Sequence, residues 1–448
     1  MLTSLLHQYR ASILLLILAF AFVTRILFVD QPEEYYFDEV YHSVTARLIA
    51  ENDPRAFEWW NTAPEQDTAI DWLHPPVAKY IQASTVLLFG ANSFGFRFSS
   101  VLFGVVVILL TYHVAQRLFN NTRLSLLAAA LASFDGLLLA QSRITMNDIH
   151  VTAFILLSTL CFLTYLHNQN SKWLLLTGVI TGITIATKWS GILILPAFVA
   201  LLFFNWLASG NQIQVKKIAQ VVGALGIIPL IVFISSYALM FAQGKDLAHF
   251  IELQKQVWWY QTTLSATHPA QSRPWEWVLN TSPVWYHVDY ISDELRGNIY
   301  AQGNLPLYWL GAIAVLAASL HVARKKITAF TASRNASYVQ RLQAITRSVV
   351  TEPVAPLVLL YFILWVPWLF SPRIMFFYHY APAVPFMCIL LAWWLLRLQQ
   401  KIKHGSYLIW TAFLVIGVWF VAWYPYWTGV PTPIIFHENI YQYFDVWK

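Results

Sequence analysis

Charged residues are scarce in this sequence of 448 residues, because Asp, Glu, Lys and Arg make up only 11% of it. A typical soluble domain contains about 25% charged residues. Hydrophobic residues make up 58% of the chain. A chain with so little polar surface is not expected to fold in water. The composition therefore argues against a soluble domain of any size and predicts a polytopic integral membrane protein.

The chain has only two cysteines, Cys161 and Cys388, and both fall inside apolar runs. This excludes a disulfide framework and a cysteine-rich metal cluster. Glycine-rich phosphate-binding patterns and the HExxH zinc pattern are also absent, so neither a nucleotide cofactor nor zinc is indicated. The net charge of +6 is scattered between apolar runs, which argues against a nucleic-acid partner.

Long apolar runs recur along the whole chain. One crossing of the membrane takes about 20 apolar residues, and this criterion predicts an all-α bundle of eleven transmembrane helices. An odd number of spans places the termini on opposite sides. The first run continues past a small-residue site at Ala19-Phe20-Ala21, so we expect an uncleaved anchor. The predicted spans are 11–29, 95–117, 124–141, 149–167, 172–188, 190–207, 218–241, 305–322, 354–370, 375–397 and 406–424.

Charges of opposite sign separate between the two sides of these spans. Of the 22 acidic residues, eleven lie between Asp30 and Asp71, and only Glu352 falls clearly on the other side. The other side holds 15 of the 28 basic residues. Because cytoplasmic loops carry an excess of Lys and Arg, we expect a plasma-membrane protein with a cytoplasmic N-terminus and acidic chemistry on the extracytoplasmic side.

Two outer loops are long, 30–94 and 242–304, and loops of this length are usually functional or have structure of their own. The first is expected to contain short helices lying along the membrane. The second carries five tryptophans, which we interpret as membrane anchors rather than as sugar-stacking residues: Trp258, Trp259, Trp275, Trp277 and Trp285. The inner loop 323–353 is basic and is expected to meet anionic lipid headgroups.

Adjacent carboxylates, Asp38 and Glu39, follow the first span by a few residues. In a helix, consecutive side chains point about 100° apart, so the two can serve different partners. One can act as a base while the other orients it or binds a cation. The alternative is a solvated acidic loop, because Glu33 and Glu34 stand nearby.

Arginines within or beside the apolar runs are functional candidates, because a charge inside a span is costly. Arg25 lies inside the first run and needs an acidic partner, for which Asp38 or Glu39 is among the nearest in sequence. Arg97 opens the second span. It is either a snorkelling residue at a span end or a phosphate ligand.

Three further polar segments stand near the outer ends of spans. His74 precedes two prolines, which predicts a rigid turn that feeds a helix. This histidine either positions a substrate oxygen or caps the turn. The link 142–148 contains Arg143 and Asp148, and we expect Arg143 to share a helix face with Asn147. Lys188 stands at the end of the fifth span. Arg143 and Lys188 are each candidates for a lipid phosphate or for ordinary interfacial placement.

These segments together resemble the protein O-mannosyltransferase family of the glycosyltransferase C superfamily. The resemblance covers nearly the whole chain and includes FDEVYH (37–42), HPPVAK (74–79), SRITMND (142–148), TKWSG (187–191), RPWEWVLNTSPVWYH (273–287) and SPRIMFFYHYAPAVPF (371–386). It implies transfer of mannose from polyprenyl-phosphate mannose to Ser or Thr of a protein. It also implies an eleven-span bundle with its catalytic face outward.

The resemblance implies roles for individual residues. Asp38 is then the general base, Glu39 supports it, and Arg25 and Arg97 are essential cations of the site. The candidates for contact with the donor phosphate are Arg97, Arg143, Lys188 and Arg373.

One part of the eukaryotic pattern is missing. The second long loop has only about sixty residues and shows no strand pattern, so the β-trefoil (MIR) insert is not expected. The whole chain, 1–448, is predicted to be one transmembrane domain of the bacterial type.

A lipid phosphate leaves without a strong acid if cations stabilise its charge, so one base and some arginines suffice. Base-assisted single displacement predicts inversion at the anomeric carbon. No metal is expected, although Asp38, Glu39 and Asp148 are capable of holding a hard divalent cation. Two alternatives stay open at this point: a sister enzyme that moves aminoarabinose onto a lipid or glycan, and a transporter.

Overall fold

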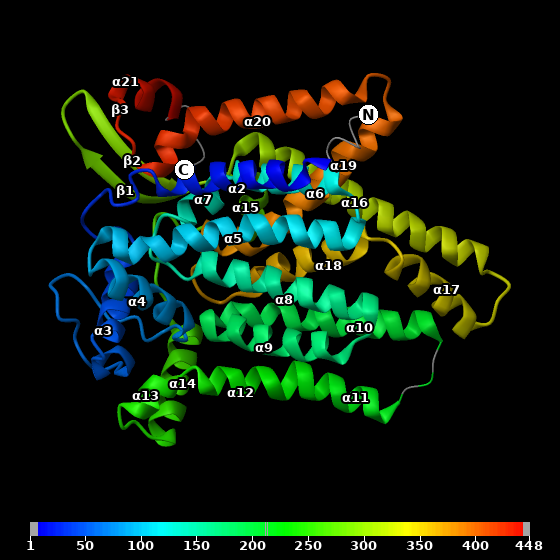
Figure 1. Cartoon of the computed structure of the whole chain (residues 1–448), viewed down its shortest axis with the longest axis horizontal. Coiled ribbons are helices and arrows are strands. Elements are labelled where there is room, and N and C mark those ends of the chain that lie inside the picture. The colour runs from blue at the N-terminus through cyan, green and yellow to red at the C-terminus, as the bar shows by residue number, and fades with distance from the viewer. Residues whose placement is uncertain (1–7, 211, 213, 442–448) are drawn as a thin grey trace.

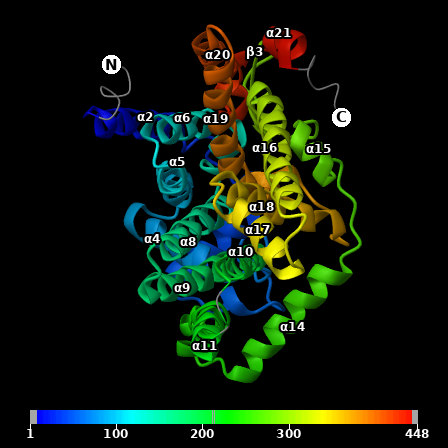
Figure 2. The same cartoon turned by 90° about the vertical axis from the view of Figure 1, so that its right-hand side faces the viewer.

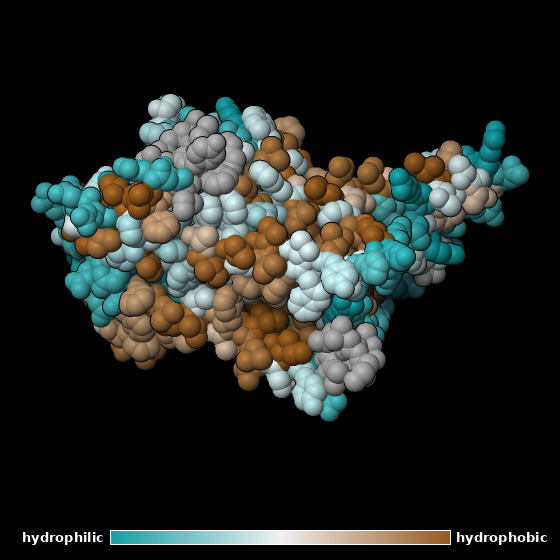
Figure 3. All heavy atoms as spheres, turned by 90° about the horizontal axis from the view of Figure 1, so that it is seen from above, coloured by the Kyte–Doolittle hydropathy of each residue, from teal (hydrophilic) through white to brown (hydrophobic). Residues whose placement is uncertain are grey.

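A computed structural model describes residues 8–210, 212 and 214–441 of the chain. The ends of the predicted 1–448 unit, 1–7 and 442–448, lie outside the described residues. The described chain is mostly helical, and its long helices lie side by side along one direction (Figure 1). Seen from above, apolar residues gather over the middle of the molecule and hydrophilic ones toward its two ends (Figure 3). This is the surface expected of a membrane protein.

The N-terminal half consists of helices alone. Their bounds are α2 (Arg10–Ile26), α3 (Glu39–Ala50), η1 (Pro54–Phe57), α4 (Val77–Phe89), α5 (Ser93–Phe119), α6 (Thr122–Ser133), α7 (Gly136–Gln141), α8 (Asp148–Asn168), α9 (Ser171–Thr187), η2 (Trp189–Leu193), α10 (Ile194–Ser209), α11 (Val215–Val222), η3 (Gly223–Ile227) and α12 (Ile228–Ser235).

The C-terminal half adds a small sheet. Its elements are α13 (Ala238–Ala242), α14 (Leu247–Thr263), α15 (Pro274–Leu279), β1 (Val284–Tyr290), β2 (Leu295–Ala301), α16 (Leu305–Ala332), α17 (Tyr338–Val350), α18 (Val354–Trp365), η4 (Val366–Phe370), η5 (Phe377–Ala383), α19 (Val384–Lys401), α20 (Gly405–Thr428), β3 (Thr432–Pro433), α21 (Ile434–Phe436) and η6 (His437–Tyr441).

Seven helices among the described residues are long and apolar enough to cross a membrane, or eight if the bent pair α17 and α18–η4 counts as one span. The predicted number of eleven is therefore not confirmed. One reason is visible in the predicted span 124–141, which is broken between α6 and α7. There Asp135 caps α7 by accepting a hydrogen bond from the Leu138 N–H at 2.7 Å. Two other predicted spans, 11–29 and 172–188, form helices of only 17 residues. This is shorter than the roughly 20 residues of one crossing.

The second long loop contains strands, so the prediction that it has none was wrong. β1 and β2 pair antiparallel from Val284 opposite Ala301 to Tyr290 opposite Arg296, and β3 adds to β2. Val284 and Tyr286 are buried while Trp285 is exposed. The alternation and the β-branched and aromatic residues of this segment are typical of a strand, but the alternation runs over few residues.

The two long loops meet at one end of the bundle. α3, α4, α13, α14 and the β1–β2 hairpin lie at the left of Figure 1, whereas α17 lies at the right. Figure 2 shows α14 and α15 along the outside of the bundle. In the interior, α8 packs against both α5 and α9. The first residue of α8, Asp148, thus belongs to the end where the long loops gather.

Candidate active site

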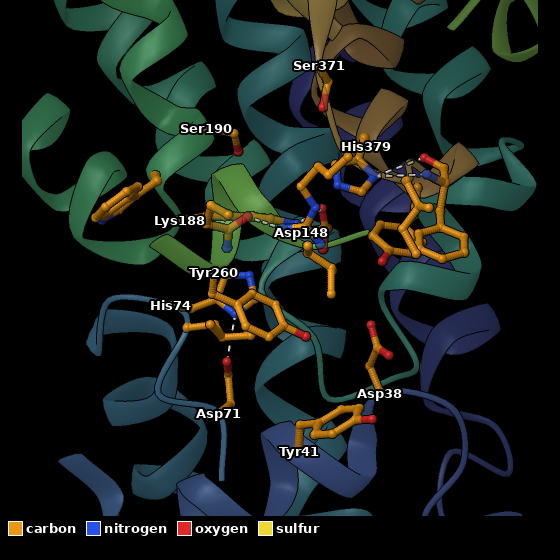
Figure 4. Close-up of a pocket in the computed structure, with 18 of the residues that line it drawn as sticks. Asp38, Tyr41, Asp71, His74, Asp148, Lys188, Ser190, Tyr260, Ser371 and His379 are labelled. Atoms are coloured by element: carbon orange, nitrogen blue, oxygen red, sulfur yellow. Dashed lines mark hydrogen bonds and ion pairs between the residues drawn. The ribbon is translucent and has the colours of Figure 1, made fainter. Parts of the chain in front are cut away.

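Asp38 lies near the start of the first long loop, 30–94, and faces a cavity of about 820 Å³ (Figure 4). It directly precedes α3, and its side chain does not cap that helix. Instead Asp38 lines the cavity together with Tyr378. Burial raises the pKa of Asp38 to about 7, and the nearby Asp148 and Asp71 add to this rise while Lys188 and Lys79 oppose it. A carboxylate with such a pKa is suited to take up a proton near neutral pH.

Glu39 points away from this cavity and pairs with Arg97. The carboxylate receives hydrogen bonds from Arg97 Nε at 2.9 Å and Nη2 at 2.8 Å, and from the Thr145 N–H at 2.9 Å. Both side chains of the pair are 1% exposed. Adjacent carboxylates thus serve different partners, as predicted, and Glu39 is a positioning residue rather than part of the cavity wall.

The remaining donors of Arg97 bind the chain that leads to Asp38. Nη1 donates to the carbonyl oxygens of Val29 and Pro32 at 3.0 and 2.7 Å, and Nη2 donates to that of Glu34 at 3.1 Å. Because the guanidinium is buried and fully engaged, it is neither a snorkelling residue nor free to bind a phosphate. It fastens the loop instead.

Arg25 does not pair with Asp38 or Glu39, so that prediction was wrong. Its Nε donates to Ser142 Oγ at 3.1 Å and its Nη1 to the Ala21 carbonyl oxygen at 3.2 Å. The side chain is fully buried between α2 and the 142–147 link. Glu39, one of the two predicted partners, is paired with Arg97 instead.

Arg143 is also buried outside the cavity wall. Its Nη1 donates to the carbonyl oxygens of Arg25 and Leu27 at 2.8 and 2.7 Å, and its Nη2 donates to those of Phe28 and Thr428 at 3.0 and 3.4 Å. The arginine therefore satisfies orphan carbonyls at the end of α2. The predicted helix face shared with Asn147 was wrong, because residues 142–147 form turns between α7 and α8.

Two cations do face the cavity, Lys188 and Arg373. Lys188 follows the last residue of α9, and its Nζ lies 2.7 Å from Asp148 Oδ1. Arg373 comes from the segment before η5 and contacts Gln261, while its Nε is buried without a hydrogen-bond partner. Asp38, Asp148 and these two cations come from four separate segments. The fold therefore brings two carboxylates and two positive charges to one cavity.

A histidine and aspartate cluster lines another part of the same cavity. His74 and His42 each place Nδ1 2.8 Å from an oxygen of Asp71, and Lys79 Nζ lies 2.9 Å from Asp71 and contacts His42. Burial lowers the pKa of His42 to about 3, and Lys79 contributes. Burial alone would raise the pKa of Asp71, but the adjacent His74, Lys79 and His42 hold it well below its usual range.

Sequence reasoning missed Asp71, His42 and Lys79 as site residues. The last two stood inside the quoted FDEVYH and HPPVAK segments, so their proximity to Asp38 and His74 was the available signal. The ligand atoms of His42, Asp71 and His74 lie within 4.8 Å of one another. This is the group of possible metal ligands found in the described part of the chain, and two of its members, Asp71 and His42, contact the Lys79 ammonium. The predicted set Asp38, Glu39 and Asp148 does not converge, since Glu39 binds Arg97.

One part of the cavity wall is apolar and aromatic. It includes Trp189, Ile192 and Leu193 of η2, Trp368 of η4 and Trp258 of α14. Ile192 and Trp258 are more than half exposed. A polar floor beside an apolar, open wall suits a substrate with a charged headgroup and a hydrocarbon tail.

Two family models match the chain. A model described as dolichyl-phosphate-mannose-protein mannosyltransferase covers residues 73–235. Another, described as the C-terminal four-transmembrane region of protein O-mannosyltransferase, covers residues 246–447. The chain belongs to the protein O-mannosyltransferase family. It is accordingly a glycosyltransferase, and the transporter alternative is overturned.

The relatives of this family member include bacterial enzymes. It is 24% identical to the polyprenol-phosphate-mannose–protein mannosyltransferase of Corynebacterium glutamicum over 84% of this chain and 81% of that protein. It is 25% identical to the corresponding enzyme of Mycolicibacterium smegmatis over 61% of this chain and 63% of that protein. An undecaprenyl phosphate-aminoarabinose arabinosyl transferase of Pseudomonas fluorescens is 29% identical, over 47% of this chain and 39% of that protein.

Solved structures share the fold of this mannosyltransferase-family chain. The protein O-mannosyltransferase Pmt1–Pmt2 complex of S. cerevisiae, bound to the sugar donor, matches with a TM-score of 0.74 and 13% identity over 94% of this chain and 90% of that chain. ArnT from Cupriavidus metallidurans, bound to undecaprenyl phosphate, matches with a TM-score of 0.56 and 16% identity over 93% of this chain and 63% of that chain. The predicted helical membrane bundle of the glycosyltransferase C type is confirmed, apart from the number of spans and the small β1–β2–β3 sheet.

Proposed function

We propose that this enzyme transfers mannose from polyprenyl-phosphate mannose to Ser or Thr hydroxyls of proteins, with Asp38 as the general base. The observation that carries the proposal is the position of Asp38, which shares one cavity with Lys188 and Arg373. The named function of the C. glutamicum relative supports the donor and the acceptor. The apolar wall beside η2 offers a path for the polyprenyl chain.

The reaction follows from the charges in the cavity. The acceptor hydroxyl gives its proton to an Asp38 carboxylate oxygen while its own oxygen bonds to the anomeric carbon. The bond between that carbon and the phosphate oxygen breaks, and the electron pair leaves with the lipid phosphate. Lys188 and Arg373 stabilise the charge that develops on this phosphate. A single displacement inverts the anomeric carbon.

The proposed topology places this cavity on the extracytoplasmic side of the plasma membrane, with the N-terminus in the cytoplasm. The distribution of charge supports it, because the basic residues gather at the other ends of the spans. Acceptors would then be secreted or membrane proteins. Cysteine accessibility at Asp67→Cys and Ser337→Cys, which lie at opposite ends of the bundle, tests the orientation in intact cells.

We also propose that transfer needs no divalent cation. The Lys79 Nζ lies 2.9 Å from Asp71 and contacts His42, so it is next to two members of the His42–Asp71–His74 group. A fixed positive charge in that place does what a metal ion would do for Asp71, and it disfavours a second cation.

The decisive experiment compares the wild type with Asp38→Asn in proteoliposomes that contain radiolabelled polyprenyl-phosphate mannose and a Ser/Thr peptide. We expect Asp38→Asn to lose at least about a hundredfold in rate, since general-base catalysis contributes about 10²–10⁴-fold. Asp67→Asn is the matched control, because it changes an exposed acid of the same loop and should keep normal transfer.

Two results would reject the proposal. Near-normal transfer by a folded Asp38→Asn enzyme would reject the base, and retention of the donor's anomeric configuration in the glycopeptide would reject single displacement. An assay with polyprenyl-phosphate aminoarabinose and a lipid acceptor tests the alternative activity, the transfer of aminoarabinose onto a lipid. The longer match to the protein mannosyltransferases favours the mannose donor.

A further inference from the structure

A second cavity, of about 440 Å³, lies at the other end of the bundle. Its distance from the catalytic cavity follows from α8, which contributes its first residue, Asp148, to one cavity and its penultimate residue, His167, to the other. Nineteen residues of helix span about 28 Å, which is close to the thickness of the hydrocarbon core. The second cavity therefore belongs to the opposite membrane face and has no part in the transfer chemistry.

The interior of this cavity is built from aliphatic and aromatic side chains of three helices. They come from α8, α10 and α18: Leu163, Leu166, Leu201, Phe204, Leu359 and Phe362. Leu201 and Leu163 are buried even though they line a cavity. A space of this size lies within the range of about 300 to 1,000 Å³ that ligand sites occupy. Its apolar wall suits a hydrocarbon chain.

Three basic side chains surround the same cavity. Arg117 comes from the last turn of α5, His167 from the last turn of α8 and Lys326 from α16. Neither Arg117 nor Lys326 makes an ion pair within the described residues, and the Arg117 Nε is buried with no hydrogen-bond partner. A buried, unpaired guanidinium nitrogen is costly without a partner. An anion that enters this cavity would provide one.

The single acid on the cavity wall, Glu352, does not neutralise these cations. Its carboxylate is engaged by Lys325 Nζ at 2.8 Å and by His321 Nε2 at 3.0 Å. Both partners belong to α16. The positive charge of Arg117 and Lys326 is thus left for a ligand.

α17 covers one end of this second cavity, and it is basic like the cavity wall. It lies at 84° to the α18 segment and carries Arg341 and Arg347. Arg347 holds it in place by donating from Nε and Nη2 to the Ala208 carbonyl oxygen at 3.2 and 2.9 Å. A helix across the span direction at a membrane face lies at the level of the lipid headgroups.

We propose that this cavity is a binding site for one anionic phospholipid of the bilayer. The phosphate would sit between Arg117 and Lys326, and one acyl chain would fill the apolar interior between α8, α10 and α18. Arginine and phosphate form strong, directional hydrogen bonds, and an acyl chain buried among leucines gains the hydrophobic term. The bound lipid would join five helices at the face opposite the active site.

The test is native mass spectrometry of the detergent-purified, delipidated full chain titrated with phosphatidylglycerol or with phosphatidylcholine. We expect one phosphatidylglycerol to bind at least about fivefold more tightly than phosphatidylcholine. The variant Arg117→Gln/Lys326→Gln should lose this selectivity, because each basic residue contributes about fivefold to anionic-lipid attraction. Leu359→Trp, which fills the interior, should weaken both lipids.

Arg324→Gln is the control, since it removes an exposed charge from α16 outside the cavity, and it should bind as the wild type does. All variants should keep mannosyl transfer in detergent, which shows that they fold. Equal binding of the two lipids to the wild type, or unchanged selectivity in the double variant, overturns the site. Preference for polyprenyl phosphate over phosphatidylglycerol by more than about tenfold overturns the assignment to a bilayer phospholipid.

Discussion

The Arg97 guanidinium binds both carboxylate oxygens of Glu39, with Nε and Nη2 at 2.9 and 2.8 Å, and the pair is 1% exposed. This pair joins the start of α5 to the start of α3. Because Asp38 is the residue before Glu39, the same pair fixes where the proposed base stands. If Asp38 is the base, as proposed, Arg97 and Glu39 are positioning residues that act through the place of Asp38.

Removing one partner of this pair should unfold the loop rather than only slow the reaction. Losing one member of a buried ion pair costs about 3–5 kcal/mol. We therefore expect Arg97→Ala and Glu39→Ala each to lower the thermal midpoint in a fluorescence unfolding assay and to abolish transfer. The double variant should lose much less stability than the sum of the losses in the two single variants. Additive losses would show that the two side chains act independently.

The pH profile should reveal the proposed base. The pKa of Asp38 is raised to about 7, and only the ionised carboxylate accepts a proton. We expect kcat/KM for the peptide to fall tenfold per pH unit below about 7 and to level off above it. A profile that is flat between about pH 5 and pH 8 would contradict this role for Asp38.

The same pKa predicts the stability of Asp38→Asn. A carboxyl whose pKa is raised by folding stabilises the fold at low pH, and this contribution is lost as the pH rises toward the folded-state pKa. The loss therefore runs from the ordinary value of 3.8 to about 7. Asp38→Asn should melt like the wild type near pH 4 and at a higher temperature near pH 8. A lower midpoint than the wild type at pH 8 would contradict the raised pKa.

Much of the fold and part of the site could be predicted from the sequence, for identifiable reasons. Span length and charge asymmetry depend on local composition. The membrane bundle and its acidic end could therefore be predicted from the sequence. The adjacent carboxylates made Asp38 a candidate, and only the resemblance to the family gave it the role of base. The partners of Arg25 were not, since Ser142 is 117 residues away in the sequence and no local pattern records that contact.

Breaks inside apolar runs were the other limit. Composition treats 124–141 as one span, but the buried Asp135 starts a new helix there by capping Leu138. A single charged residue among eighteen barely changes the mean hydropathy. Likewise, the cluster of His42, His74 and Lys79 around Asp71 depends on how the first long loop folds back. The spacing of these residues in the sequence does not determine that.

Lys188 should matter for the chemical step. It faces the cavity and balances Asp148 at 2.7 Å. Removing one preorganised charge from an active site costs about 10²–10³ in kcat, so we expect Lys188→Gln to lose that much at a temperature where it is still folded. Because the variant leaves the buried Asp148 carboxylate without its partner, its thermal midpoint should also fall. Lys255→Gln is the control, because Lys255 is exposed on α14 and pairs only with Glu252. Equal rates for the two variants would remove Lys188 from the site.

Arg143 should show the opposite behaviour. It satisfies carbonyl oxygens of Arg25, Leu27 and Phe28 and does not line the cavity. Each unsatisfied buried carbonyl costs about 1–3 kcal/mol. Arg143→Ala should therefore lose about 3 kcal/mol or more of stability in a denaturant titration. The fraction that stays folded at low temperature should keep its KM for the lipid donor, and a selective rise in that KM would instead make Arg143 a phosphate ligand.

We expect the Lys79 ammonium to determine how the enzyme responds to metals. It lies 2.9 Å from Asp71, next to the His42–Asp71–His74 group, so treatment of the wild type with EDTA should leave transfer unchanged. Lys79→Ala removes this charge and leaves two imidazoles and a carboxylate, a donor set that suits Zn²⁺. We expect this variant to retain one equivalent of zinc after gel filtration, measured by elemental analysis, whereas the wild type and Lys255→Ala retain none. Loss of wild-type activity in EDTA with recovery in added metal would contradict metal-independent transfer, because the fixed ammonium would then not replace the ion.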